Sequence, residues 1–235
     1  MTPLAGRLAV VTGASRGIGH AIARIFAEAG ARVVRVARSL TAGADGLLLD
    51  YPADVADPPA VAALAARVVA EVGTPDILVN NAGVFDRIPF EQATVAELTR
   101  QLQVNLVGPF AITQAFMPAM RRAGRGQVIN IGSVADATGF PENSIYSATK
   151  YGLRGMHESL AAEYHGTGIR FALVSPGPTD TPIWDGAGGS RPVRPRSEML
   201  KPSDVAEAVL FVATRPPRMT IDVLRMSPSP TESET

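Results

Sequence analysis

Residues 8–19, LAVVTGASRGIG, join a short apolar run to a glycine-rich turn. Apolar residues then recur at helical spacing from Ala21 to Ala29, and Gly30 is placed to end that helix. The glycines therefore lie between a buried strand and the amino end of a helix, where free amides and the positive end of the helix dipole bind phosphate. An ordinary strand-to-helix turn is the alternative, and the rest of the chain decides between the two.

Strands and helices continue to alternate after this turn. Further strands are predicted at Arg32–Ala37, in the apolar stretch from Leu47 to Val55, and at Asp76–Val79, Gln127–Ile131, Ile169–Val174 and Ile221–Met226. Helices are predicted between Pro58 and Gly73, at Leu98–Met117, around residues 144–150 and at Asp204–Ala213. This order predicts a Rossmann-type α/β fold, a doubly wound and mostly parallel sheet in a single domain over residues 1–226. Because little chain separates Ser39 from Gly46, the second crossover helix is expected to be absent or reduced to a turn.

Two segments are predicted to lie outside this pattern. Residues 183–200 are rich in Gly, Pro and Arg and are expected to form a lid loop over the substrate. Residues 227–235 are expected to be a mobile polar tail.

Composition narrows the class of protein. The chain has 235 residues, of which 46% are hydrophobic, enough for one sizeable core. Acidic and basic residues number 22 each, so no strongly basic surface indicates nucleic acid or membrane as a partner. There is no cysteine, which excludes disulfides and Cys-ligated metal, and no metal site is expected. No apolar run approaches the roughly 20 residues of a membrane span, and a soluble, cytoplasmic protein is expected.

Tyr146 and Lys150 lie four positions apart in a predicted helix, so their side chains share one face. A free tyrosine has a pKa of about 10, but a fixed ammonium nearby favours the phenolate. The pair could therefore act as an acid or base, or it could be the polar edge of an amphipathic helix.

Other unusual residues fall at the same edge of the predicted sheet, where ligands bind in such folds. Asn80-Asn81-Ala82-Gly83 follows one strand, and Ser133 follows another. Within the helix predicted at 98–117, Pro109 lacks an N–H, so the main-chain carbonyl of Asn105 loses its helical partner. This convergence favours a binding site over isolated structural features.

Together these motifs resemble the short-chain dehydrogenase/reductase family. The residues that carry the resemblance, in order and over nearly the whole chain, are Thr12-Gly13-x-x-x-Gly17-x-Gly19, Asn80-Asn81-Ala82-Gly83, Asn105, Ser133, Tyr146-x-x-x-Lys150 and Pro176-Gly177. The resemblance implies an NAD(P)-dependent carbonyl/alcohol oxidoreductase with Asn105, Ser133, Tyr146 and Lys150 as catalytic tetrad. The implied cofactor contacts are Gly13, Ser15, Arg16, Gly17, Ile18, Gly19, Arg38, Asp54, Val55, Asn80, Ala82, Gly83, Tyr146, Lys150, Pro176, Gly177, Thr179 and Thr181.

The resemblance also assigns roles in the reaction. Tyr146 would protonate the carbonyl oxygen, and Ser133 would donate a hydrogen bond to it. Lys150 would hold the nicotinamide ribose and, together with the oxidised nicotinamide, lower the pKa of Tyr146 toward 7, while Asn105 would serve a water relay.

The second strand favours NADP(H) over NAD(H). An acidic residue at its carboxyl end would bind a free 2′-hydroxyl, but Ala37-Arg38-Ser39 stands there, with Arg38 and Arg16 available to a 2′-phosphate. The alternative is that Arg38 is one more surface arginine. The missing crossover helix could leave the adenine pocket open. The C-terminal end lacks the Asp-Gly-Gly finish common in the family and resembles the branch with 3-hydroxy acid and serine dehydrogenases.

Substrate choice is left open by the sequence. The positions that shape the pocket in the family are Phe85, Ala135, Asp136, Phe140, Asn143, Pro178 and Trp184, and Trp184 could equally anchor its loop. His20, His157 and His165 are expected at the surface or an interface. The function expected is reduction of a small or medium carbonyl compound, or oxidation of its alcohol, in a homotetramer or homodimer. The alternative is a catalytically weak NADP(H)-binding regulatory or scaffold protein.

Overall fold

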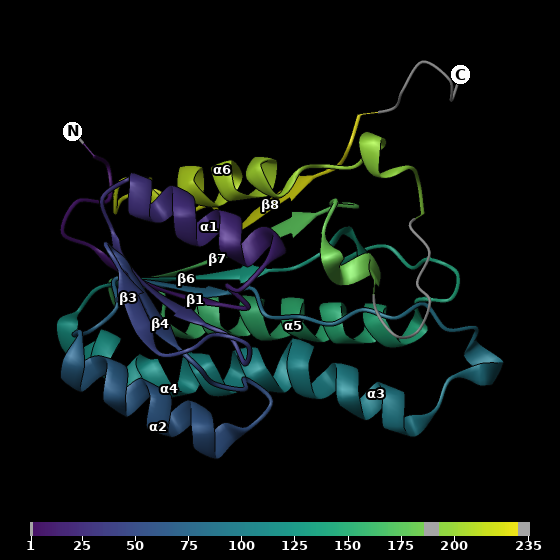
Figure 1. The fold of residues 1–235 in the computed structure, drawn as a ribbon, viewed down its shortest axis with the longest axis horizontal. Coiled ribbons are helices and arrows are strands. Elements are labelled where there is room, and N and C mark those ends of the chain that lie inside the picture. The colour runs from purple at the N-terminus through teal and green to yellow at the C-terminus, as the bar shows by residue number, and fades with distance from the viewer. Residues whose placement is uncertain (1, 186–192, 230–235) are drawn as a thin grey trace.

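The computed structural model describes residues 2–185 and 193–229, which form one eight-stranded sheet between two layers of helices (Figure 1). The strands are β1 (Leu8–Thr12), β2 (Arg32–Val36), β3 (Gly43–Asp45), β4 (Leu48–Tyr51), β5 (Ile77–Asn80), β6 (Gly126–Ile131), β7 (Ile169–Pro176) and β8 (Val223–Met226). Their order across the sheet is β3-β4-β2-β1-β5-β6-β7-β8, and every pair is parallel except β3 with β4. The predicted doubly wound α/β fold is confirmed.

Six α-helices cover the two faces of the sheet. They are α1 (Gly17–Glu28), α2 (Pro58–Glu71), α3 (Val95–Leu102), α4 (Gly108–Ala123), α5 (Ser144–Glu163) and α6 (Pro202–Ala213), with short 3-10 turns at Phe90–Gln92, Val134–Asp136, Pro182–Asp185 and Arg196–Glu198. Helices α1 and α6 lie on one face, and the other four lie on the opposite face (Figure 1). Within the described residues, no helix is long and apolar enough to cross a membrane.

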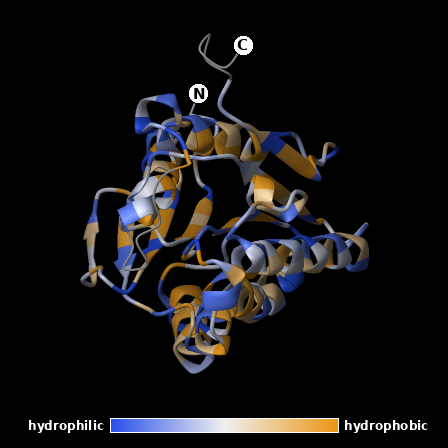
Figure 2. Cartoon of the chain, turned by 90° about the vertical axis from the view of Figure 1, so that its right-hand side faces the viewer, coloured by the Kyte–Doolittle hydropathy of each residue, from blue (hydrophilic) through white to orange (hydrophobic). Residues whose placement is uncertain are grey.

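Apolar side chains fill both spaces between the sheet and the helices. On the first face Phe26 of α1 and Val209 of α6 are fully buried, and on the second Phe116 of α4 is fully buried. Hydrophobic residues are accordingly concentrated on the strands and on the helix faces that meet them (Figure 2). Burial of each such side chain contributes about 1.5–3 kcal/mol relative to exposure, so the sheet is a rigid base for residues at its carboxyl edge.

The second crossover is short, as predicted, and contains a strand that the sequence did not indicate. After β2 the chain forms β3, which pairs antiparallel with β4, and β4 returns parallel to β2 with Leu48 opposite Val33. Gly46, at a φ of 58°, makes the turn of this hairpin. An antiparallel hairpin at the sheet edge therefore replaces the helix of the usual crossover.

The helix predicted over 98–117 is divided in the structure. Helix α3 ends at Leu102, a π-helical turn spans Gln103–Val107, and α4 begins at Gly108. Pro109 therefore occupies the first turn of a new helix, where its missing N–H costs nothing. Of the predicted lid and tail, residues 186–192 and 230–235 lie outside the described part of the chain.

Candidate active site

A cavity of about 1030 Å³ opens at the carboxyl ends of the strands. Most of the sequence-predicted site residues line it, namely Gly13, Ser15, Arg16, Gly17, Ile18, Arg38, Asp54, Val55, Ala82, Gly83, Phe85, Ser133, Ala135, Phe140, Asn143, Tyr146, Lys150, Pro176, Gly177, Pro178, Thr179, Thr181 and Trp184. Segments that are far apart in the sequence thus meet at one site. Gly19, Asn80, Asn105 and Asp136 do not line the cavity and support it from behind.

The glycine-rich turn lies against the end of β5. Asn81 joins the two segments, because its Nδ2 donates to the Thr12 carbonyl at 2.9 Å and its main-chain N–H donates to Thr12 Oγ1 at 3.0 Å. Gly13 has a φ of 65°, and a Cβ there would lie 2.8 Å from Ala82 Cα. Only glycine fits this close approach. Gly19 serves the same packing, since a Cβ on it would lie 2.3 Å from Asn81 Nδ2.

Helix α1 points its amino end into the cavity. No side chain caps this end, and its first turn carries no acidic residue. The turn therefore presents uncapped amides and the positive end of the helix dipole, which suits a phosphate group.

Arginines stand at the end of the cavity formed by β2 and β4. The Arg38 side chain is 71% exposed, and its Nη1 faces Asp54 Oδ2 at 3.6 Å. Arg16, the residue before α1, lines the same space. An exposed ion pair of this length contributes little to stability, so Arg38 is available to a bound anion.

Tyr146, Lys150 and Ser133 meet at the opposite end. Tyr146 and Lys150 come from adjacent turns of α5, and Lys150 Nζ lies 5.6 Å from the centre of the Tyr146 ring. Nζ also donates to the Ile131 carbonyl at 2.9 Å, which ties the ammonium to the end of β6. Ser133 follows β6, and its hydroxyl makes a hydrogen bond with that of Tyr146. The sequence spacing therefore does place these three groups together.

Burial dominates the acid–base character of this pair. The Tyr146 ring keeps some exposed surface in the cavity, but burial of its hydroxyl raises the pKa to about 12. The hydrogen bond with Ser133 lowers this pKa, and the Asp136 charge raises it further. Burial lowers the pKa of Lys150 to about 8, and the Asp136 charge opposes this. The expected lowering of the tyrosine pKa is therefore not a property of the protein without its dinucleotide.

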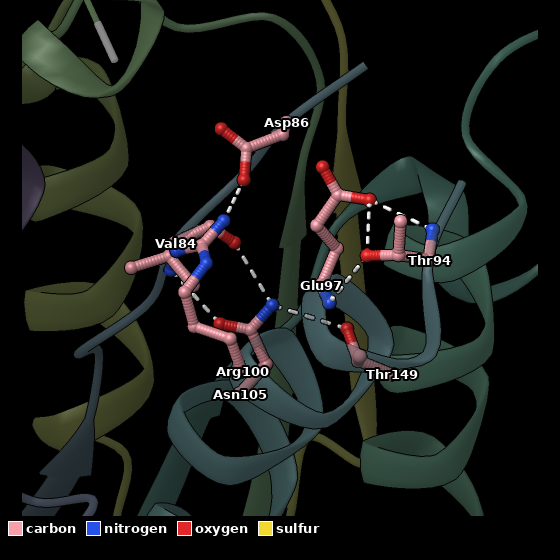
Figure 3. Close-up of polar contacts among 7 residues, drawn as sticks. All are labelled: Val84, Asp86, Thr94, Glu97, Arg100, Asn105 and Thr149. Carbon is pink, nitrogen blue, oxygen red and sulfur yellow. Dashed lines mark hydrogen bonds and ion pairs between the residues drawn. The ribbon is translucent and has the colours of Figure 1, made fainter. Parts of the chain in front are cut away.

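Asn105 lies in the π-helical turn and bonds to Thr149, on the helix that also carries the pair (Figure 3). Its side chain is fully bonded: Oδ1 accepts from the Val84 N–H at 2.9 Å, and Nδ2 donates to the Val84 carbonyl at 2.9 Å and to Thr149 Oγ1 at 3.1 Å. Thr149 Oγ1 donates in turn to the Tyr146 carbonyl at 2.8 Å. Asn105 thus links the loop after β5 to the helix that carries Tyr146.

Comparison with known proteins agrees with this geometry. A family model described as short chain dehydrogenase matches residues 7–189. The chain belongs to the short-chain dehydrogenase/reductase family. It is therefore an NAD(P)-dependent oxidoreductase acting on CH–OH groups, as the motifs indicated.

Named relatives cover most of the chain. It is 37% identical over 226 residues to D-threitol dehydrogenase of Mycolicibacterium smegmatis, across 90% of this chain and 87% of the relative. It is 39% identical over 227 residues to cis-4-hydroxycyclohexanecarboxylate dehydrogenase of Sinomonas cyclohexanicum, across 89% and 90%. Among solved structures, the closed form of serine dehydrogenase complexed with NADP+ has a TM-score of 0.86 and 31% identity, and covers 94% of each chain.

Three aromatic rings form one wall of this dehydrogenase cavity. Phe85 packs edge-on against Tyr146, with ring centres 4.6 Å apart, and against Trp184, with centres 5.2 Å apart. Trp184 Nε1 donates to the Thr179 carbonyl at 2.9 Å. Trp184 therefore lines the pocket and anchors its loop as well, so both interpretations made from the sequence apply.

The dehydrogenase structure differs from the sequence-based expectations at two residues and adds a third residue to the cavity. His157 is buried, not at the surface, because it is 1% exposed and its Nε2 lies 3.1 Å from the Asp222 carbonyl. The Asn80 side chain donates to Thr113 and Asn130 in the core and does not reach the cavity. Arg225 lines the cavity although no motif marked it.

Proposed function

We propose that this protein reduces a small or medium carbonyl compound with NADPH, or oxidises the matching alcohol with NADP+. The observation that carries the proposal is the meeting of Tyr146, Ser133 and Lys150 at one end of a cavity whose other end holds Arg16 and Arg38. The first group suits proton transfer to an oxygen, and the second suits a phosphate.

The residues of the cavity fit a dinucleotide. Its volume of about 1030 Å³ is at the upper end for cofactor sites. The uncapped amides of α1 and the close-packed Gly13 make a cradle that a Cβ would fill. Arg38 and Arg16 favour a 2′-phosphate because no acidic residue follows β2 to bind a free 2′-hydroxyl. Serine dehydrogenase, a solved structure similar to this chain, is complexed with NADP+, which supports the same preference.

The side chains of the tetrad supply the proton and the orientation. When bound, the dinucleotide supplies or accepts the hydride. Tyr146, with a pKa of about 12, is protonated at neutral pH and so is ready to donate its proton to the carbonyl oxygen during reduction. The Ser133 hydroxyl donates a hydrogen bond to the same oxygen. Oxidation requires the phenolate, which a cation near the ring favours.

Lys150 is suited to passing the proton on. With a pKa of about 8, its ammonium can give and regain a proton near neutral pH, which an ordinary lysine does poorly. We retain from the sequence the proposal that the main-chain carbonyl of Asn105 binds a relay water.

The protein is also proposed to form a homotetramer or homodimer. The exposed aromatic side chains Phe110 and Tyr151 on α4 and α5 support such an assembly.

The decisive experiment compares Tyr146→Phe with Tyr151→Phe. Tyr151 lies on the same helix, but its side chain is exposed and outside the cavity. We expect Tyr146→Phe to lower kcat for a panel of aldehydes and ketones by about 10²–10⁴-fold or more while the Kd of NADPH changes less than about twofold. Tyr151→Phe should retain turnover. Undiminished turnover in Tyr146→Phe would contradict the mechanism, and tight NADPH binding without turnover of any compound would favour the regulatory alternative.

A further inference from the structure

A buried carboxylate lies behind the catalytic serine. Asp136 is 0% exposed, and its Oδ2 accepts hydrogen bonds from the Ser175 hydroxyl and, at 3.3 Å, from the Ser133 N–H. A Cβ at Gly132 would lie 2.5 Å from this oxygen and 2.8 Å from Ser175 Oγ, so only glycine leaves room for the pair. The end of β6 is therefore shaped around this carboxylate.

The other oxygen of Asp136 faces a cation on the last strand. Asp136 Oδ1 lies 3.5 Å from Arg225 Nη2, and the Arg225 side chain is 46% exposed. Arg225 lines the cavity beside Gly177 and Pro228. Asp136 is the only partner of this guanidinium among the residues that the structure describes. A half-exposed guanidinium thus lies at the cavity with N–H groups available to a ligand.

One carboxylate contacts both the Ser133 backbone and Arg225. Asp136 holds the Ser133 backbone with one oxygen and the guanidinium with the other. Its charge also acts to raise the pKa values of Tyr146 and Lys150. Ser133 and Arg225 line the same cavity, so one substrate can meet Ser133 with its carbonyl oxygen and Arg225 with an anionic group.

The charge at this position selects the kind of anion. A guanidinium matches a carboxylate in a planar, two-bond geometry. Since Asp136 already offsets part of the positive charge, a monoanion is favoured over a doubly charged phosphate. Phe85 and Trp184 line the same cavity, and such an apolar wall lowers the local dielectric, which strengthens a charged contact.

We propose that Arg225, anchored by the buried Asp136, binds the carboxylate of the substrate, so that the enzyme acts on short oxo acids and hydroxy acids. This rests on the proposed function, because it names the substrate class of the same site. Arg225 is here a specificity-determining residue, and Asp136 is the residue that positions it.

The test uses matched pairs of substrates that differ only in charge. The full-length enzyme is assayed with NADPH on 3-oxobutanoate, 4-oxopentanoate and 5-oxohexanoate and on the methyl ester of each. We expect kcat/KM for at least one acid to exceed that for its ester, and Arg225→Gln to lower this acid-to-ester ratio by about 10- to 100-fold through KM. Arg218→Gln, at an exposed arginine that makes no contact with the cavity, is the control and should keep the ratio of the natural enzyme.

A binding measurement separates this proposal from the proposed function. Thermal unfolding of the enzyme with saturating NADP+ is followed with pentanoate and with pentanamide. Stabilisation by pentanoate alone, lost in Arg225→Gln and kept in Arg218→Gln, supports the carboxylate site even if no oxo compound is turned over. Equal use of acids and esters, turnover of esters alone, or an acid preference that survives in Arg225→Gln overturns it. Turnover of esters without acid preference would leave the proposed function standing and refute only this inference.

Discussion

Lys150 and Arg38 carry the same charge at opposite ends of one cavity, in opposite surroundings. Lys150 is 6% exposed, and its ammonium is bonded to a carbonyl at the end of a core strand. The Arg38 side chain is 71% exposed, and Asp54, 3.6 Å away, is its partner among the described residues. The lysine comes from a long, packed helix, whereas the arginine follows β2, at the point where the β3–β4 hairpin replaces a crossover helix.

The two residues differ in how much their burial costs the folded protein. Burial lowers the pKa of Lys150 to about 8, because the charged ammonium is destabilised away from water. A bound group that hydrogen-bonds to the ammonium would offset this desolvation cost. Solvent screens the charge of Arg38, so its contribution to stability is small and its contribution to binding depends on the anion beside it. Substitutions at the buried end should therefore have large effects on both chemistry and folding, and those at the exposed end small effects on affinity.

Lys150→Met should have the largest effect. Without the ammonium, we expect turnover to fall by about 10²–10⁴-fold, since proton transfer through this site is lost. Stability without dinucleotide should change in the opposite direction. Between pH 8 and 10 the unfolded chain keeps the Lys150 proton and the folded chain releases it, so the unfolding free energy of the natural protein should rise with pH by up to about 1.4 kcal/mol per unit.

Lys150→Met should remove that slope and be the more stable protein at pH 7. The slope is measured by urea unfolding at several pH values below 10. In this range Tyr146 keeps its proton in both the folded and the unfolded chain, so its raised pKa does not contribute to the slope. Lys201→Met, at the exposed second lysine, is the control and should keep the slope. A slope unchanged in Lys150→Met would show that burial of the ammonium carries no such cost.

Gly13→Ala should have the next largest effect, because Gly13 lines the cavity and packs against Ala82 at the end of β5. Its φ of 65° and the approach of Ala82 Cα to 2.8 Å of a Cβ both oppose a side chain. Gly46 is a matched control, with a φ of 58° and open space around it. We expect Gly46→Ala to cost about 1–2 kcal/mol from backbone strain, and Gly13→Ala about 1–3 kcal/mol more from the clash.

Urea unfolding gives both costs, and fluorescence titration with NADPH gives the change in Kd. Only Gly13→Ala should weaken NADPH binding, because only that turn faces the phosphates in the proposed complex. Equal costs at the two glycines would mean that Ala82 moves aside, and the cradle would then be less rigid than its contacts indicate.

The sequence predicted the features that repeat at fixed spacing. The glycine turn and the Tyr146–Lys150 pair were found because local geometry follows from local spacing. Pro109 marked a break in a helix, although the π-helical turn that resolves it depends on packing against α5. The fold class followed because alternating strands and helices have few ways to pack.

The remaining features depend on contacts between distant parts of the chain. Residues 43–45 have no strand pattern, and they form β3 because β4 offers a free edge. Arg225 gains its place through Asp136, which is 89 positions earlier in the chain. The rise in the Tyr146 pKa in the protein without its dinucleotide also could not be predicted from the sequence, since burial outweighs the neighbouring groups and is a property of the folded protein.

Arg38→Ala should have the smallest effect and sharpens the comparison from the exposed end. We expect KM for NADPH to rise about tenfold, the value of one exposed charge-assisted contact to a phosphate, and KM for NADH to change less than about twofold. Because the contact is screened, the NADPH effect should shrink as salt is raised from 0.05 to 0.5 M. Steady-state kinetics with both dinucleotides measures it.

Arg32→Ala is the matched control, since Arg32 begins the same strand at the edge of the sheet opposite the cavity and is also exposed. It should leave both constants unchanged. Equal rises for NADPH and NADH in Arg38→Ala would mean that the guanidinium contacts a group common to both dinucleotides, such as the adenine ring. The open edge left by the β3–β4 hairpin, and not a 2′-phosphate site, would then govern how this end of the cavity binds.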